Sequence, residues 1–494
     1  MKFSKYISLA LVALLATSCT EGLMDDINKD NGHPGAETVD SKFALSGIIT
    51  GTAFSTVSGA YAFYASSYTE QEFGTGLLQM ARAEVRNASE TASSTTFGNE
   101  WDATYTNLRA IKEVEDKCAE GGVNAGQHDV LGVAQTLKAL NLGVLTDMHG
   151  DVPYSQALGG QSNLTPTLDS QEDIYKAIFS LLDQAVANFT EAKSGRESHI
   201  GSQDLLYAND NTKWLAFAYA LKARYKLHTQ LRNSNAVAEA LEAAEAAKAA
   251  GFDGAELSVF DDSNNNPWTA FFWSREYTAS SKTVADLMAE RNDPRRAVYV
   301  CDFFNSTEVG TPGDQTRANE VETLAAPSWL NNGGASIHLL SKSEFYFILA
   351  ECKARLGQDA KADFVTGVEA SFADYANADA GQTAGFSAAQ GSAYAQALPV
   401  TLTEILTQKY LAQARDEQVE TYNDLRRIKA IGEEHVKLKN PRNQSSTGNA
   451  WPLRLPYGES DVRSNPNVRK AFGTGNEAGR YVFTENVWWA GGSR

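Results

Sequence analysis

Apolar residues recur at helical spacing through most of this chain. The longest stripe contains Val130, Val133, Leu137, Leu140 and Val144, and its period of about 3.6 residues predicts a helix over 128–148. The same period predicts further helices over the following ranges: about 41–64, 99–119, 174–189, 214–228, 236–250, 345–356, 359–377, 402–410 and 417–430.

These predicted helices come in pairs that are joined by short breaks. Gly251 and Gly357 follow two of them, in the position where glycine commonly ends a helix. The pairing suggests helical hairpins stacked as in tetratricopeptide arrays, although no clean repeat of about 34 residues is visible. We therefore predict an all-α, tetratricopeptide-like fold. No Pro/Ser-rich linker divides the chain, so we expect a single large domain over 41–494.

Long stretches without a clear period separate the helix pairs. They are rich in Gly, Asn, Ser and aromatic residues, and they cover about 65–98, 191–210, 252–280, 300–342 and 431–494. Loops of this length in a compact domain are usually functional or disordered, and their aromatic content argues against disorder. We expect ordered elaborations on a helical scaffold.

The N-terminus has the pattern of a secretory signal. Lys2 and Lys5 precede an apolar run over 7–16, which is too short to span a bilayer. The run ends at Cys19 in a loose match to a bacterial lipobox. We predict a signal peptide over 1–18, lipid attachment at Cys19 and a tether over 19–40; a plain signal peptide with an incidental Cys is the alternative. Thr20, rather than Asp, after the Cys favours the outer membrane by the sorting rules of Gram-negative lipoproteins.

The body of the chain is acidic. The formal charge is −18, and it becomes −20 without residues 1–18, which carry two lysines and no acidic residue. This charge disfavours nucleic acid, anionic membranes and polyanionic glycans, and it favours neutral ligands. Three cysteines remain and allow at most one disulfide; Cys352 lies in an apolar stretch and is expected to be buried. We expect no second segment that is long and apolar enough to cross a membrane.

The stretch LTDMHGDVPYSQA (145–157) places Asp147, His149 and Asp151 at alternate positions. A metal site would need further ligands, and neither HExxH nor a second nearby His is present. Gly150 and Pro153 are helix stop signals, and a His in the last turn interacts favourably with the helix dipole. We interpret the stretch as a helix end and expect no metal there.

The loop DDSNNNPWTAFFWSREY (261–277) is the main candidate for a ligand site. Its rings offer flat apolar faces and its Asp and Asn residues offer hydrogen-bonding groups, as sugar and peptide sites require. We predict ligand contacts from Asn266, Trp268, Trp273 and Tyr277, with Trp268 and Trp273 exposed; the alternative is that these rings form the loop's own core. The Asp/Asn cluster also suits Ca²⁺, but it lacks the Gly and final Glu of an EF-hand loop. We expect no cofactor.

Other aromatic and basic residues give secondary candidates. Tyr68, in YASSYTEQEFGTG (64–76), and Trp329, on a Gly/Asn-rich loop, are further predicted ligand contacts. Trp488 and Trp489 are expected to pack the C-terminal tail onto the body. The basic groups in 221–228 and 423–427 are expected on solvated helix faces or in buried salt bridges.

Seven segments in a characteristic order make the chain resemble the SusD/RagB family, and within it the SusD-like nutrient-binding outer-membrane lipoproteins. They are DINKDNGHPG (26–35), LTDMHGDVPYSQAL (145–158), TPTLDSQEDIYKAIFSLLDQA (165–185), DLLYANDNTKWLAFAYALKARYKLH (204–228), SKTVADLMAERNDPRRAVY (281–299), EFYFILAECKARLG (344–357) and ILTQKYLAQARDEQVETYNDLRRIK (405–429). The resemblance implies helix pairs with long loops. It also implies a lipid-anchored, surface-exposed outer-membrane protein that delivers a glycan, or in some members a peptide, to a SusC-like TonB-dependent transporter.

Three functions remain open from the sequence. The first is a non-catalytic binder of a neutral oligosaccharide or an oligopeptide. The second is a surface glycosidase, which needs two carboxylates about 5–10 Å apart in a deep cleft. The third is a helical-repeat scaffold for other proteins. We favour the first, mainly because of the resemblance.

Overall fold

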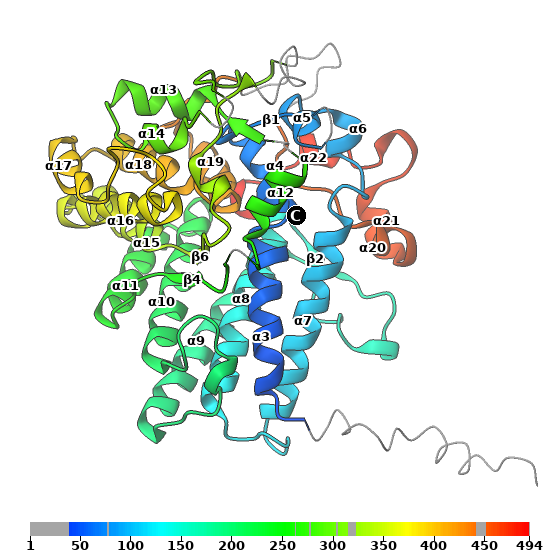
Figure 1. Cartoon of the computed structure of the whole chain (residues 1–494). Helices are drawn as coiled ribbons and strands as arrows, with labels where there is room; N and C mark the ends of the chain where they lie inside the picture. Colours follow the sequence, from blue (N-terminus) through cyan, green and yellow to red (C-terminus); the bar gives the residue numbers. More distant parts are fainter. Residues whose placement is uncertain are drawn as a thin grey trace, which may run out of the picture.

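The computed structural model describes residues 39–76, 79–261, 263–275, 278–302, 305–314, 323–440 and 451–493. Cys19, the proposed signal and most of the tether lie outside these residues, as does Tyr277. The long N-terminal helices run side by side and form one half of the molecule, while the shorter helices of the C-terminal part gather over the other half (Figure 1).

The first half contains the predicted helices with shifted ends, but the single helix predicted over 41–64 is divided into two shorter helices. They are α3 (Lys42–Gly51), α4 (Ala60–Tyr68), α7 (Gly98–Cys118), α8 (His128–His149), α9 (Gln171–Gly195), α10 (Asn211–His228) and α11 (Ala236–Ala249). Side chains fix several starts: Ser170 accepts a hydrogen bond from the backbone N–H of Asp173, and Asp210 caps α10 in the same way. A π-helical turn over Thr52–Val57 joins α3 to α4.

The second half contains α15 (Lys342–Arg355), α16 (Lys361–Asp379), α18 (Leu402–Gln413) and α19 (Gln418–Ala430), again as predicted. Consecutive helices pack as pairs, among them α7 with α8, α10 with α11, and α15 with α16. The all-α prediction of stacked helix pairs is therefore confirmed. The helix α17 (Gln390–Ala397) was not predicted, because its Ala/Gly/Ser-rich sequence buries only Gly391 and Ala395 and gives no apolar stripe.

The stretches without a clear period are ordered where they are described, and they contain short elements. Their short helices are α5 (Gln79–Glu84), α6 (Ala88–Thr91), α12 (Pro267–Arg275), α20 (Glu459–Ser464), α21 (Pro466–Phe472) and α22 (Tyr481–Thr484). Two further short helices, α13 (Lys282–Glu290) and α14 (Arg296–Tyr299), lie between two of these stretches. Three two-stranded antiparallel sheets pair β1 (Glu72–Gly74) with β5 (Thr278–Ser280), β2 (Val152–Pro153) with β3 (Leu168–Asp169), and β4 (Ala255–Leu257) with β6 (Ile337–Leu340).

One main hydrophobic core runs from α3 to the C-terminal tail. Trp489 is fully buried in it, which confirms that the tail packs onto the body. Cys352 is buried as expected, and Cys118, Cys301 and Cys352 are all free thiols. A smaller cluster around Phe347 lies between α15, α16 and α18.

One stretch of the described residues, Lys42–Tyr68, is long and apolar enough to cross a membrane by length and composition alone. The expectation that no such segment follows the N-terminal one is therefore wrong by this criterion. Leu45, Ile48 and Ile49 of the stretch are buried, and α3 packs against α7 and α8. A core helix passes the same test, so the finding is explained by packing within the domain.

Candidate functional site

The helix α12 carries two large rings on the flanks of its outward face. With about 3.6 residues per turn, Ala270 and Ser274 point in nearly the same direction, and Phe271 and Trp273 lie on either side of them. Ala270 and Ser274 are exposed, Phe271 is half-buried, and Trp273 is 48% exposed. We call these four residues the aromatic platform. Its two accessible rings offer apolar surface on which a flat ligand can stack.

The inner face of α12 is anchored in the core. Trp268 and Phe272 are buried one turn apart, and the indole Nε1 of Trp268 donates a hydrogen bond to Ser58 Oγ at 3.0 Å. Phe63 of α4 lies edge-on to Trp268 and stacks on Phe271, with ring centroids 4.5 and 4.2 Å away. The platform is therefore held rigidly by the N-terminal helices.

The start of α12 is fixed to the loop over 331–335. Asn266 Oδ1 accepts from the backbone N–H of Trp268, and Asn266 Nδ2 donates to the carbonyl oxygen of Ala335, both at 2.8 Å. Gly333 lies so close that an added Cβ would stand 2.0 Å from Asn265 Oδ1. The buried side chain of Asn266 thus connects the start of α12 to this loop by hydrogen bonds.

The predicted ligand contacts separate into two groups. Trp273 is exposed as predicted, whereas the prediction that Trp268 is exposed is wrong, since only 4% of it is accessible. Asn266, Trp329 and Tyr68 are also buried, so none of the three offers a surface to a ligand. Asn266, Trp268 and Trp329 do come together, around an internal cavity of about 10 Å³.

Long-range packing explains the burial of Trp329 and Tyr68. The ring of Trp329 lies against Tyr299 and Tyr375, with centroids 6.0 and 5.2 Å apart. The backbone carbonyl of Tyr68 accepts a hydrogen bond from Trp451 Nε1 at 2.7 Å. These partners are far away in the sequence, so local patterns did not reveal them.

Sequence patterns did not identify Phe63 as a support of the platform, and they did not single out Phe271 as a ligand contact. Phe63 lies at the end of the helix predicted over 41–64, where a half-buried ring cannot be distinguished from a core residue by pattern. A second exposed ring, Phe54, is 36% exposed and stacks on Phe260, just before the Asp/Asn loop. In that loop Asp261 Oδ1 accepts from the N–H groups of Ser263 and Asn264 at 2.8 Å, which is an ordinary turn.

The stretch 145–157 ends α8, as predicted: the helix stops at His149, and Gly150 follows with a φ of 79°. Its ψ of −131° lies outside the left-handed helical region that a glycine after a helix commonly adopts. Burial, followed by the nearby charge of Arg454, lowers the pKa of His149 to about 3. The imidazole is therefore neutral, and the predicted dipole interaction of a charged His149 is wrong.

The three polar groups of this stretch do not converge. Asp147 Oδ1 accepts from Tyr175 Oη at 2.5 Å and from Trp489 Nε1 at 2.8 Å. His149 Nε2 lies 2.8 Å from Tyr61 Oη, and Asp151 Oδ1 accepts from the backbone N–H of Gln171. Asp147 and Asp151 thus both join α9 to the end of α8, whereas His149 joins α4 to it.

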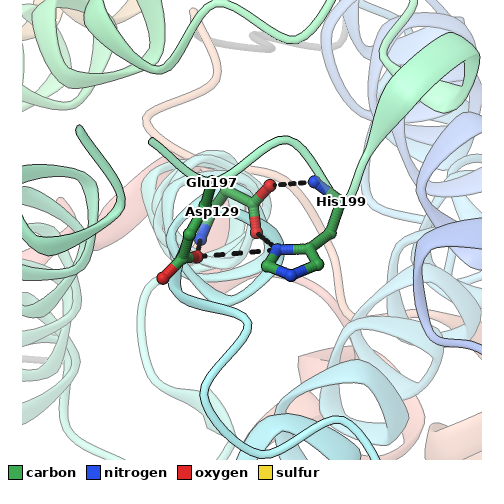
Figure 2. Close-up of side chains that lie close together, drawn as sticks. All are labelled: Asp129, Glu197 and His199. Carbon is green, nitrogen blue, oxygen red and sulfur yellow. Dashed lines mark hydrogen bonds and ion pairs between the residues drawn. The ribbon is translucent and has the colours of Figure 1, made fainter. Parts of the chain in front are cut away.

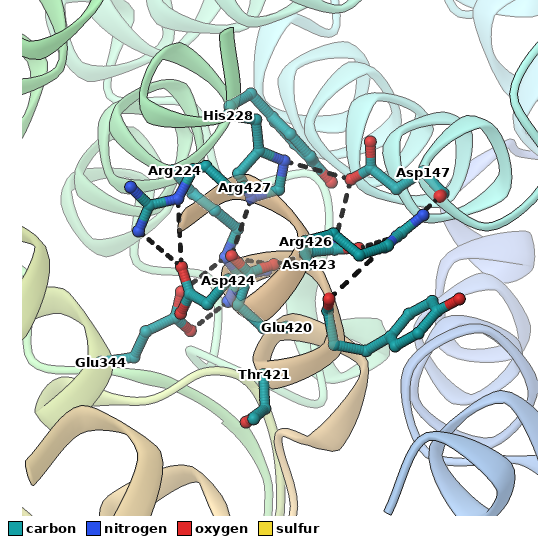
Figure 3. A network of polar contacts seen from close by, with 12 residues as sticks. Asp147, Arg224, His228, Glu344, Glu420, Thr421, Asn423, Asp424, Arg426 and Arg427 are labelled. Carbon is teal, nitrogen blue, oxygen red and sulfur yellow. Dashed lines mark hydrogen bonds and ion pairs between the residues drawn. The ribbon is translucent and has the colours of Figure 1, made fainter. Parts of the chain in front are cut away.

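Asp147 belongs to a buried polar network between α8, α10 and α19 (Figure 3). His228 lies between two carboxylates, with Nδ1 3.2 Å from Asp147 Oδ2 and Nε2 2.8 Å from Glu420 Oε1. Burial alone would lower the pKa of His228, but Glu420 and Asp147 raise it to about 9. Arg224 pairs with Glu344 in the same network. Arg224, His228 and Arg427 are thus in buried salt bridges, one of the two predicted alternatives, whereas Arg426 donates to the carbonyl oxygen of Asp147 and to Asn423 Oδ1.

One group of described side chains has the composition of a metal site. Asp129, Glu197 and His199 bring potential ligand atoms within 4.8 Å of one another near the start of α8 (Figure 2). Asp129 Oδ1 accepts from Val130 N at 2.9 Å and lies 2.8 Å from His199 Nδ1, while Oδ2 accepts from His199 N at 2.7 Å. Because these bonds already occupy both oxygens, we interpret the group as a latch that holds the segment after α9 to α8.

Comparisons with known proteins agree with this architecture. A SusD-like family model, described as starch-binding and associating with the outer membrane, matches residues 43–458. The chain is similar to a SusD/RagB family protein from Bacteroides thetaiotaomicron VPI-5482, with 34% identity and a TM-score of 0.81 over 92% of this chain and 100% of that one.

Two more distant structures share the fold. A SusD homologue from Bacteroides fragilis NCTC 9343 has 20% identity and a TM-score of 0.71 over 92% of this chain and 100% of its own. A chitin-binding SusD homologue from Flavobacterium johnsoniae has 20% identity and a TM-score of 0.67 over 90% and 98%. No curated protein matches the chain.

Proposed function

Because the chain belongs to the SusD-like family, we propose that it captures a neutral glycan on the aromatic platform and passes it to a SusC-like TonB-dependent transporter. The observation that carries this proposal is the pair of accessible rings, Phe271 and Trp273, on a helix whose inner face is locked in the core. Sugar rings present C–H faces that stack on such rings, and a rigid seat loses little entropy on binding.

Charge supports a neutral ligand. The body of the protein carries an excess of acidic residues, which repels uronic acids and sulfated sugars. The solved relative from Flavobacterium johnsoniae is described as chitin-binding, and the family as starch-binding, so starch-type and chitin-type oligosaccharides are the first ligands to try. An accessible apolar surface is sufficient for a binder, and we propose no catalytic step.

The proposal includes the place where capture occurs. Lipid attachment at Cys19 would hold the protein in the outer membrane, with residues 20–40 as a tether to the helical domain. A protein anchored in this way at the cell surface meets oligomers before they reach the transporter. Metabolic labelling with an alkyne fatty acid, compared between the wild type and Cys19→Ala, tests the anchor directly.

Electrophoresis in native gels that contain dissolved glycans tests the binding function. We expect retardation by at least one neutral glycan and none by polyuronates, with the effect lost in Trp273→Ala. If no glycan retards the protein and calorimetry shows binding of oligopeptides, the ligand is a peptide rather than a sugar. Hydrolysis of the retained oligosaccharide would contradict the non-catalytic role.

A further inference from the structure

A separate cavity of about 140 Å³ lies between α18, α19 and the segment over 433–438. Its apolar walls include Leu406, Tyr410, Leu425, Ile428, Val436 and Trp451. For comparison, an engineered apolar cavity of about 150 Å³ accepts one benzene molecule. The cavity therefore has room for a single six-membered ring, and none of the platform residues lines it.

The buried and half-buried charged groups that line this cavity are already paired, whereas Lys429 and Glu434, which also line it, are exposed to solvent. Asp424 Oδ2 lies 2.6 Å from Lys409 Nζ, and Asp424 Oδ1 lies 2.7 Å from Arg427. Glu433 pairs with Arg355 and with His435, each at 2.9 Å. A charged ligand would gain little from these groups and would lose its hydration, so the cavity favours a neutral one.

The two aromatic walls also have their polar atoms occupied. Trp451 Nε1 donates to the carbonyl oxygen of Tyr68 at 2.7 Å, and Tyr410 Oη donates to that of Thr69 at 2.9 Å. A sugar would leave most of its hydroxyl groups without partners against such walls. An apolar ring suits them better.

One hydrogen-bond donor in the cavity wall has no partner among the described residues. Gln71 Nε2 donates to the carbonyl of Tyr410 and to Thr421 Oγ1, at 2.9 and 3.0 Å. Thr421 Oγ1 in turn donates to Gln413 Oε1 at 3.0 Å. This chain of bonds orients the amide of Gln413, whose Nε2 is buried and has no hydrogen-bond partner among the described residues. A buried donor of this kind calls for an acceptor from a ligand.

We propose that this cavity binds a small, neutral ring compound that carries one hydrogen-bond acceptor, such as an aromatic ketone. The ring packs between Tyr410, Trp451 and the aliphatic side chains, and the acceptor takes the free N–H of Gln413. This site is independent of the glycan platform, so the protein has a second ligand of a different chemical class.

A matched pair of fluorinated probes tests the proposal on the mature protein by fluorine NMR titration. We expect 4′-fluoroacetophenone to bind and 4-fluoroethylbenzene, which lacks the acceptor, to bind at least tenfold more weakly. Gln413→Leu should weaken the ketone at least tenfold and change the hydrocarbon less than twofold. Leu425→Trp, which fills the cavity from its half-buried edge, should abolish both.

Leu356→Trp, at an exposed position elsewhere, is the control and should bind like the wild type. Leu438→Trp replaces Leu425→Trp if that variant does not fold. The proposal is overturned if the ketone fails to bind, if it binds the filled variants unchanged, if Gln413→Leu weakens both probes equally, or if methyl glucoside binds as well as the ketone.

Discussion

The ring of Phe63 in α4 stacks on the ring of Phe271 in α12, with 4.2 Å between the centroids and 14° between the planes. This contact joins the N-terminal core helix to an element about two hundred residues later in the chain, and it fixes one side of the aromatic platform. The other side, Trp273, remains accessible. A platform that is rigid before the ligand arrives does not have to be ordered by it, which favours affinity for weakly binding sugars.

Trp268 should matter for stability rather than for direct contact. Because the side chain is buried and bonded to Ser58, we expect Trp268→Ala to lower the free energy of unfolding by about 3–5 kcal/mol. Trp268→Phe keeps most of the ring packing and should cost less. Urea unfolding measures both values. If Trp268→Ala unfolded like the wild type yet lost glycan binding, Trp268 would be a ligand contact after all.

The buried position of His228 predicts a pH-dependent stability. Its pKa is raised from 6.5 to about 9, so the charged imidazole stabilises the fold fully below pH 6.5. This contribution, on the order of 3 kcal/mol, is lost as the pH rises from 6.5 through 9. The difference in unfolding free energy between the wild type and His228→Gln should shrink across that window. A difference that stayed constant from pH 6 to 10 would show that His228 is neutral in the folded protein.

The latch of Asp129, Glu197 and His199 should not need a metal. Because hydrogen bonds occupy both oxygens of Asp129, we expect the melting temperature to be the same in excess Zn²⁺ or Ca²⁺ as in EDTA. Asp129→Ala should lower it under all of these conditions, since the segment after α9 loses its attachment. An increase in melting temperature with Zn²⁺ that His199→Ala removes would identify a metal site instead.

Periodicity predicted the scaffold because the long helices bury apolar stripes, as Ile174, Ile178 and Leu182 do in α9. The same rule explains the error at Trp268. The segment around it was interpreted as an irregular loop, in which alternate rings face outward. In a helix, residues four apart lie on the same face, so Trp268 and Phe272 share the buried face of this segment. Trp273 lies on the other side.

Local sequence patterns could not predict which distant residues form hydrogen bonds or ring contacts with a given side chain. Asp147 is a helix-end residue locally, and only the folded chain brings Tyr175, His228 and Trp489 to its carboxylate. Trp329 lies on a Gly/Asn-rich loop that is typical of the surface, yet Tyr299 and Tyr375 cover it. Pairings of this kind follow from the tertiary fold, which local spacing does not contain.

Calorimetric titration of the best-retained neutral glycan into the wild type and Trp273→Ala shows whether the aromatic platform binds the ligand. Phe43→Ala, which removes a 57% exposed ring at the far end of α3, is the matched control. We expect Trp273→Ala to weaken binding at least tenfold, about 1.4 kcal/mol or more, with an unchanged melting temperature, while Phe43→Ala binds normally. Equal affinity in all three proteins would rule out the platform as the glycan site.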